Sequence, residues 1–516
     1  MSQRNIVVIL CDQLRPDFLS LYGCSAIPTP NLDRLAKLGV VFDNAISASP
    51  VCGPARASMM TGLYPSTHGV WTNNLPFRDN LDYLAVRMNA LDYATACFGK
   101  LHHYPPRDTK GFQYARQLEG GRLKENEPYL QWLRCRHPGI TDFWNCDREK
   151  HEFKLSAEDH YEYWIASETI SYIETAASKS DQPFFLWVSF QGPHTPWNPP
   201  PEIKGACNPE SFPPPIKAGE GAVCPIHTYR KVWNPFPFQD LEDIMQVRAA
   251  YGDTMANIDV QIGRILGCLD ERGLFDDTTF VFSSDHGDLL GDFGQKAKGP
   301  FPYQGQLAVP LVVANHPSIP EGVRTSNLAG NLDIPATVLD VAGDEKGIGL
   351  SRSLLDLSRE EPENPRDMNF SELGDTTKIV ENSRYRYCLY PFAGFSQLFD
   401  RWEDPQERIN LAGNPKYSSL EIEFLKELNA FSILCKGVEI PGYNLIPPVQ
   451  EELRKRHPHF DDPDHFRAAY PLNKWHKQRL KEAGLDPTYT DFYQHIRVSR
   501  FMPSDAGKGY VAEGGH

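Results

Sequence analysis

The chain has 516 residues and a formal net charge of −15, and 41% of its residues are hydrophobic and 23% charged. This composition is typical of a globular protein with more than one domain, and the acidic balance argues against nucleic acid or an anionic membrane as a partner. The apolar run at residues 6–11 is too short for the hydrophobic region of a signal peptide, and no run approaches the about 18 apolar residues of a membrane span.

The eleven cysteines are odd in number and scattered, and no two of them form a Cys-x-x-Cys pair. A disulfide framework would need regular, even pairing, so we interpret them as free thiols in a reducing compartment. The sequence therefore predicts a cytoplasmic protein.

Short apolar runs alternate with helical patterns along the first two thirds of the chain. Residues 6–11 fit a buried strand, and residues 31–39 fit a short helix. Ser156 and Asp159 resemble a capping box at the start of a long helix. Further segments continue the alternation, with strands at 184–190, 279–283 and 311–314 and a helix at 241–269. This pattern predicts an α/β fold in which helices sandwich a large, mostly parallel sheet.

The composition changes at two places. Residues 196–238 are rich in Pro, Gly and aromatic residues, which indicates an irregular insertion near the site. After residue 345 the alternation weakens, and residues 385–389 and 397–399 suggest a small antiparallel sheet. We therefore expect three parts: a catalytic domain at 1–345, a small C-terminal α+β subdomain at 346–440, and a tail at 441–516 that serves as the oligomerisation arm of a homodimer or homotetramer.

Polar residues directly follow two of the predicted strands. Asp12 and Gln13 come after residues 6–11, and Asp285 and His286 come after residues 279–283. In open parallel sheets, ligands bind beyond the carboxyl ends of the strands. Two carboxylates and one imidazole at such an edge suit a divalent cation, although each side chain could instead cap its own loop.

The segment from residue 52 to residue 62 reads Cys-Gly-Pro-Ala-Arg-Ala-Ser-Met-Met-Thr-Gly. Its Cys-x-Pro-x-Arg run, followed by Thr-Gly, resembles the signature of the sulfatase family of the alkaline phosphatase superfamily. In that family a formylglycine-generating enzyme oxidises the cysteine to formylglycine. The resemblance implies that one hydroxyl of the hydrated aldehyde at Cys52 attacks the ester beside a metal ion, and that the other expels the inorganic product. The alternative is an ordinary buried cysteine.

Other residues match the same family one by one. Residues 93–102 resemble the family's strand that ends in Gly-Lys-x-His, which implies that Lys100 and His102 contact the formylglycine and a sulfate oxygen. His194 matches the family histidine that helps protonate the leaving oxygen. Arg56 lies close enough to Cys52 in the sequence to hold the hydrate and neutralise charge nearby. The resemblance extends over about residues 5–415.

The substrate contacts are matched less tightly. Lys298 falls near the family's sulfate-binding lysine, with Lys296 as a competitor, and Asn73 falls where phosphonate-cleaving relatives keep an asparagine. Gln13 is also a candidate for substrate binding. An aromatic wall for an aryl or sugar group could come from three residues of the insertion, Trp197, Tyr229 and Trp233.

Two positions depart from the common sulfatase pattern. Many sulfatases have Asp-Asp in place of Asp12-Gln13 and Asp-Asn in place of Asp285-His286. The pattern of this chain resembles the branch that holds choline sulfatases, phosphonate monoester hydrolases and some bacterial arylsulfatases. Calcium remains the first expectation for the metal, but the added imidazole extends the choice to manganese or zinc.

The resemblance implies a sulfuric ester hydrolase that acts on a small aryl or sugar sulfate. A phosphonate monoester or phosphodiester hydrolase with the same site is the main alternative. A catalytically inert binding protein on this scaffold is a second alternative, and a serine-type or thiol hydrolase that uses unmodified Cys52 is a third. The third has no Ser/His/Asp motif with a nucleophile elbow to support it.

Overall fold

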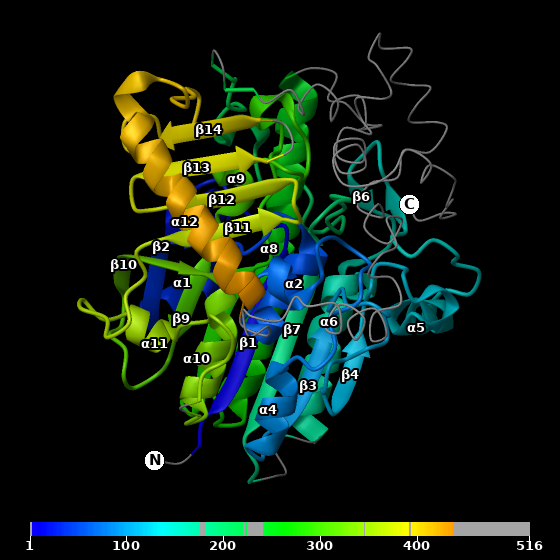
Figure 1. Ribbon diagram of the computed structural model, residues 1–516. Coiled ribbons are helices and arrows are strands. Elements are labelled where there is room, and N and C mark those ends of the chain that lie inside the picture. The colour runs from blue at the N-terminus through cyan, green and yellow to red at the C-terminus, as the bar shows by residue number, and fades with distance from the viewer. Residues whose placement is uncertain are drawn as a thin grey trace, which may run out of the picture.

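The computed structural model describes residues 3–175, 177, 181–219, 222–223, 241–344, 346–391 and 394–437. The expected tail at 441–516 lies outside these residues, as do Tyr229 and Trp233 of the expected aromatic wall. The described part has an eight-stranded sheet at its centre (Figure 1). Its strands, in spatial order, are β10 (Val323–Gly330), β2 (Gly39–Ile46), β9 (Leu311–Ala314), β8 (Thr278–Ser284), β1 (Asn5–Asp12), β7 (Phe184–Pro193), β3 (Ala94–Gly99) and β4 (Tyr114–Gln117).

All neighbouring strands of this sheet run parallel except at β9, which is antiparallel to both β2 and β8. The fold therefore confirms the predicted large and mostly parallel α/β sheet. Residues 6–11 lie within β1, which pairs in parallel with β7 on one side and with β8 on the other. The carboxyl ends of these three strands consequently meet at one edge.

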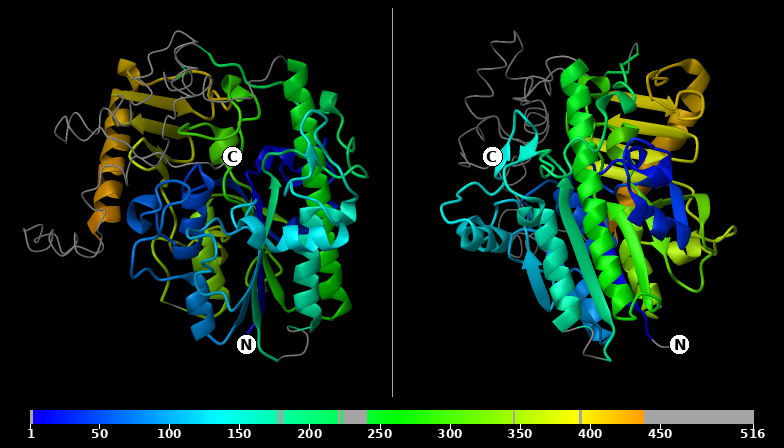
Figure 2. Two further views of the ribbon diagram at one scale, coloured as in Figure 1. Left: turned by 90° about the vertical axis from the view of Figure 1, so that its right-hand side faces the viewer. Right: turned by 180° about the vertical axis from the view of Figure 1, so that it is seen from behind.

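Helices cover both faces of the sheet, which explains why β1 is apolar along its whole length. On one face lie α1 (Pro30–Lys37), α6 (Tyr161–Thr175) and α8 (Leu241–Glu271), and they share a core with Val7 and Ile9. Figure 2 shows α8 extending along the large sheet. The other face carries Ile6 and Val8 and is covered by α2 (Cys52–Thr61), α4 (Leu84–Ala90), α10 (Ile334–Val341) and α11 (Leu354–Leu357).

The predicted capping box at Ser156 was wrong. The hydroxyl of Ser156 donates to the side chain of Asp159 at 3.0 Å instead of capping a backbone N–H. Residues Ala157–Asp159 form a separate 3-10 turn, and α6 begins only at Tyr161. Tertiary contacts thus overrode a local pattern that fits the motif.

A second sheet follows the large one along the chain. It is antiparallel, with the order β11 (Asn369–Leu373), β12 (Thr377–Glu381), β13 (Tyr385–Tyr390) and β14 (Phe395–Asp400). Helix α12 (Ser418–Gly437) lies across it and packs Phe424 and Leu428 against it (Figure 1). The predicted antiparallel sheet corresponds to β13 and β14, whereas the domain boundaries at 345 and 440 remain predictions.

A buried ion-pair network joins the second sheet to the large domain. Arg386 on β13 pairs with Glu381 and Glu407. It also donates to the carbonyl oxygen of Pro302 at 3.0 Å and to Oε1 of Gln304 at 2.7 Å. A side chain of the second sheet therefore stabilises the segment that follows Lys298.

None of the described helices is long and apolar enough to cross a membrane. The cysteines of the described residues are free thiols, as expected. The cytoplasmic location remains a prediction.

Candidate active site

Helix α2 places Cys52 at the carboxyl edge of the large sheet. The helix begins at Cys52, and all of its residues are buried. Gly62 ends it with a φ of +65°, and a Cβ there would lie 2.4 Å from the carbonyl oxygen of Ile348, so glycine is required. At the other end, the N–H of Gly53 donates to Oδ1 of Asn73 at 2.8 Å. Asn73, which was expected to contact substrate, forms a hydrogen bond to the first turn of α2 in this structure.

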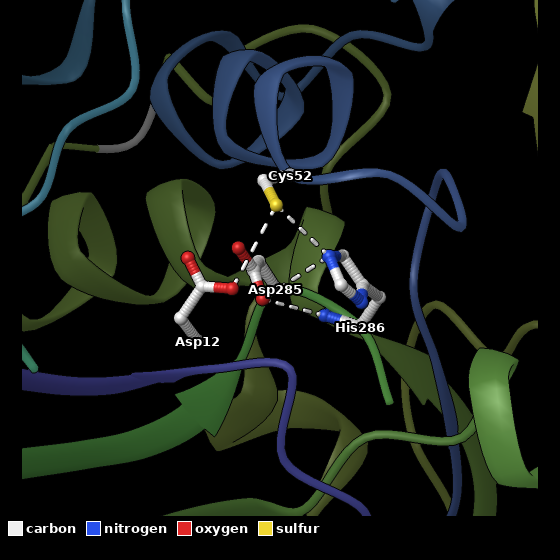
Figure 3. Close-up of side chains that lie close together, drawn as sticks. All are labelled: Asp12, Cys52, Asp285 and His286. Atoms are coloured by element: carbon white, nitrogen blue, oxygen red, sulfur yellow. Dashed lines mark hydrogen bonds and ion pairs between the residues drawn. The ribbon is translucent and has the colours of Figure 1, made fainter. Parts of the chain in front are cut away.

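Four side chains from three segments converge beneath α2 (Figure 3). Asp12 ends β1, Asp285 and His286 follow β8, and each offers one ligand atom to a group that includes Cys52. These atoms all lie within 4.8 Å of one another and all four residues are buried. The structure thus brings together every residue that the sequence nominates for the metal site.

The tautomer of His286 favours a role as a ligand. Its Nδ1 lies 2.8 Å from the carbonyl oxygen of Gly287, so Nδ1 carries the hydrogen. The lone pair of Nε2 then faces Cys52, whose Sγ is 3.1 Å away. Burial lowers the pKa of His286 to about 4, so the ring is neutral at neutral pH. Two carboxylates and one neutral imidazole form a donor set that fits a divalent cation.

Metal affinity should depend on pH through His286. The dependence is measured in Cys52→Ala, because a coordinating thiol would itself release a proton. Above its lowered pKa of about 4 the imidazole of His286 is neutral, so the affinity of this variant should be flat. As the pH falls through that value, protons compete for Nε2 and the binding constant should fall by about tenfold per pH unit. Titration calorimetry at several pH values, with circular dichroism to show that the protein stays folded, measures this slope. A loss of affinity that begins near pH 6.5, the ordinary pKa of histidine, would contradict it.

Arg56 contacts both carboxylates of the candidate metal site, Asp12 and Asp285. Its Nε donates to Oδ2 of Asp285 at 2.7 Å, and its Nη2 lies 3.3 Å from Oδ2 of Asp12. Nη1 donates to the carbonyl oxygen of Lys100 and the hydroxyl of Ser189, at 2.7 and 2.8 Å. Burial opposes the charge, but the two carboxylates raise the pKa of Arg56 above its usual value. Arg56 therefore ties the carboxyl ends of β1, β3, β7 and β8 together.

Two lysines supply further positive charge. Nζ of Lys100 lies 2.5 Å from Asp12, and Nζ of Lys298 lies 2.7 Å from both Sγ of Cys52 and Oε1 of Gln13. The amide of Gln13 in turn donates to Asp288. The competing lysine, Lys296, lies instead over the ring of Trp197, with Nζ 5.2 Å from the centroid. The geometry favours Lys298 as the anion-binding lysine.

Two histidines flank this charged group. Nδ1 of His194 donates to the carbonyl oxygen of Thr195 at 2.6 Å, so Nε2 is the nitrogen that titrates. Burial and Lys298 lower the pKa of His194 to about 3. Burial and Lys100 lower the pKa of His102 well below its usual value. Both rings are therefore neutral before an anionic substrate enters, and the negative charge of a substrate would raise both pKa values.

Sequence reasoning missed two residues of the site, Ser189 and Asp288. Ser189 binds Arg56, and Asp288 binds Gln13. Asp288 could have been found, because it is the next polar residue after the strand end that carries His286. Ser189 lies inside an apolar run, and no residue pattern marks it.

Carboxylates, an imidazole and a helix-borne cysteine at one edge of an α/β sheet define the class of alkaline phosphatase-like hydrolases. Residues 4–344 match the model of the Sulfatase family, and the chain belongs to that family. It is 29% identical over 463 residues to an arylsulfatase of Clostridium perfringens, covering 82% of this chain and 93% of that protein. It is 30% identical over 456 residues to an ulvan-active sulfatase of Formosa agariphila, covering 83% and 81%.

The fold also resembles a crystal structure of a phosphonate monoester hydrolase of Agrobacterium radiobacter. The TM-score is 0.72 at 27% sequence identity, and the match covers 83% of this chain and 96% of that chain. The chain is therefore similar both to proteins named as sulfatases and to one named as a phosphonate monoester hydrolase. This agrees with the branch that Gln13 and His286 indicate.

Proposed function

We propose that this protein hydrolyses sulfate esters to an alcohol or phenol and inorganic sulfate, with formylglycine derived from Cys52 as the nucleophile. The observation that carries the proposal is the place of Cys52. It opens a Cys-x-Pro-x-Arg run at the start of α2, and its Sγ lies within 4.8 Å of potential ligand atoms of two carboxylates and an imidazole, in a chain of the sulfatase family. The similarity to an arylsulfatase and an ulvan-active sulfatase supports sulfate as the ester.

The unmodified thiol is a poor nucleophile in this environment. Burial and the neighbouring charge of Asp12 raise the pKa of Cys52 to about 11, so a thiol here is protonated at neutral pH. This disfavours a thiol hydrolase. Hydrated formylglycine supplies two hydroxyl groups, one to displace the alcohol from the ester and one to release sulfate when the aldehyde re-forms.

The contacts of the site then have chemical roles. Asp12, Asp285 and His286 would hold a divalent cation, calcium first and manganese or zinc as alternatives. The cation would supply positive charge that activates the hydroxyl and offsets the charge of the sulfate oxygens. Lys100 and Lys298 hold the same oxygens by charge-assisted hydrogen bonds.

The histidines act on protons at two stages. Nε2 of His194, protonated once the anionic ester raises its pKa, gives its proton to the departing alcohol oxygen. His102 accepts the proton of the remaining hydroxyl as sulfate leaves. Nδ1 of His102 is buried and has no hydrogen-bond partner within the described residues, so it is open to such an acceptor role.

Phosphonate monoesters are the second candidate substrates, because the fold resembles a phosphonate monoester hydrolase and Gln13 replaces a carboxylate. Turnover of an aryl sulfate and an aryl phosphonate with the same leaving group separates the two. We expect the larger kcat/KM for the sulfate, because the Lys100 and His102 pair matches the sulfatases. A larger value for the phosphonate would assign the protein to the alternative.

The modification itself is tested by the mass of the peptide that spans residues 49–56. In protein made in cells that contain a formylglycine-generating enzyme, this peptide should be about 18 Da lighter than its cysteine form. An unmodified thiol in protein that still turns over the ester would remove formylglycine from the mechanism. The proposal also includes a formylglycine-generating enzyme as the maturation partner and a small aryl or sugar sulfate as the substrate. It further includes a homo-oligomeric state and a cytoplasmic location.

A further inference from the structure

Two glutamates outside the charged cluster hold the segments that carry the two histidines. Glu119, which follows β4, is 1% exposed, and Glu162 on α6 is fully buried. Neither belongs to the group of potential metal ligands. Both accept hydrogen bonds from backbone N–H groups at the carboxyl ends of neighbouring strands, β3 and β7.

Glu119 binds the backbone of the His102 segment. Its Oε1 accepts from the N–H of Leu101 at 2.9 Å and from that of His102 at 3.2 Å. His102 has a φ of +58°, a left-handed conformation that a non-glycine residue adopts at an energetic cost. Arg122 closes the arrangement by donating to Oε2 of Glu119 at 2.6 Å and to the carbonyl oxygen of His103 at 2.7 Å. The carboxylate thus stabilises a strained backbone at a residue with a proposed proton-transfer role.

Glu162 binds the backbone that leads to His194. Its Oε1 accepts from the N–H of Gly192 at 2.6 Å, and its Oε2 accepts from the N–H of Gln191 at 3.2 Å. A Cβ on Gly192 would lie 2.9 Å from Oε1, so glycine permits this close approach. Gln191 and Gly192 are both buried, and an unpaired buried N–H is costly.

We propose that Glu119 and Glu162 are positioning residues, Glu119 for His102 and Glu162 for His194. This inference rests on the proposed function, in which the two histidines act at different stages. Small displacements of a proton donor or acceptor lower its efficiency, so the two glutamates should have different kinetic signatures. A glutamate that merely stabilises the fold would have neither.

The signature of Glu162 is a dependence on the leaving group. Burial raises the pKa of Glu162 to about 8, so the kinetics are compared above that pH, where the side chain is a carboxylate. In Glu162→Gln, one acceptor oxygen becomes an NH₂ that faces a backbone N–H, so the segment of His194 must shift. We expect kcat/KM for phenyl sulfate to fall about tenfold more than for 4-nitrophenyl sulfate, since the better leaving group needs less protonation. Glu162→Asp, which keeps the carboxylate, should recover part of this loss.

The signature of Glu119 is a split between kcat and kcat/KM. In Glu119→Gln, the release of sulfate should slow by about tenfold and lower kcat, while kcat/KM for 4-nitrophenyl sulfate, set by the first half of the reaction, changes less. Nitrophenol should then appear in a burst before the slower steady state. Arg122→Met, at a side chain that is 19% exposed, should give a weaker form of the same signature.

The matched control is Glu372→Gln in the full-length, matured enzyme. Glu372 is also fully buried and accepts from a backbone N–H, that of Ser66, but it lies on β11 and holds neither histidine segment. We expect neither signature in this variant. Equal losses of kcat/KM for both esters in Glu162→Gln, or a parallel fall of kcat and kcat/KM in Glu119→Gln, would overturn the inference.

A readout without substrate separates this inference from the proposed function. Wild-type protein that hydrolyses no aryl sulfate would contradict the proposed function alone. Amide hydrogen exchange then decides the positioning roles: exchange at residues 191–192 should accelerate in Glu162→Gln, and exchange at residues 101–102 should accelerate in Glu119→Gln. Unchanged exchange at these amides would overturn the inference whatever the substrate.

Discussion

Replacement of Cys52 by alanine should lower kcat for an aryl sulfate by about 10⁴-fold or more, the loss typical of removing a covalent nucleophile. Under the proposed function this variant lacks the side chain that would become formylglycine, while Asp12, Asp285 and His286 remain in place as potential metal ligands. Steady-state kinetics measure the loss, and titration calorimetry measures metal binding in the same variant. We expect the variant to bind metal with reduced affinity, because only one of four ligands is lost.

The control for this variant is Cys388→Ala. Cys388 is equally buried, but it lies in β13 of the second sheet. Its loss should leave kcat within about threefold of wild type, since a buried cysteine away from the site acts as a small apolar side chain. If Cys52→Ala kept a tenth or more of the wild-type kcat, the nucleophile would have to be sought elsewhere.

Replacement of Arg56 by alanine should lower the free energy of unfolding by about 3–5 kcal/mol, because it removes the charged partner of buried Asp285 and one of the two cations that pair with buried Asp12. Arg56 is 1% exposed and binds Asp12, Asp285, Ser189 and the backbone of Lys100. Denaturant unfolding of the metal-free protein measures the change, since a bound cation would compensate part of the lost charge.

The matched comparison is Arg324→Ala. Arg324 also pairs with an aspartate, Asp43, but the two side chains are 45% and 40% exposed. Removing an exposed pair should cost less than about 1 kcal/mol. A similar cost for both arginine variants would show that burial does not set the strength of the Arg56 contacts. Arg56→Ala also alters the Cys-x-Pro-x-Arg run that the formylglycine-generating enzyme is expected to recognise. The mass of the peptide that spans residue 52 therefore shows whether a loss of stability is accompanied by a loss of the modification.

The central strands could be predicted from the sequence because burial on both faces leaves an uninterrupted apolar run. Residues of β1, β7, β8 and β9 show this pattern, and each was located within a few residues. Strand β10 was missed because it is an edge strand whose first half is exposed and polar. The reversed direction of β9 could not be predicted either, since an apolar run carries no sign of direction.

The site residues could be predicted where a reactive or metal-binding residue type stands at a recognisable place in the sequence. Asp12, Asp285 and His286 follow strand ends, and Cys52 stands in a recognisable run. Glu119 and Glu162 were not predictable, because they act on backbone N–H groups that lie 18 and 30 residues away along the chain. Backbone amides are the same at every residue, so no pattern of residue types records such a contact.

The contacts between Arg386 and the segment after Lys298 affect which parts of the chain could be exchanged with those of a relative. The family model ends at residue 344, yet the segment that follows Lys298 is held by side chains beyond that residue. Glu407 accepts from the N–H of Gln304 at 2.6 Å while pairing with Arg386, so both sheets contribute to one loop. A chimaera that joined this chain to a relative at residue 344 would therefore separate the segment after Lys298 from the side chains of the second sheet that hold it.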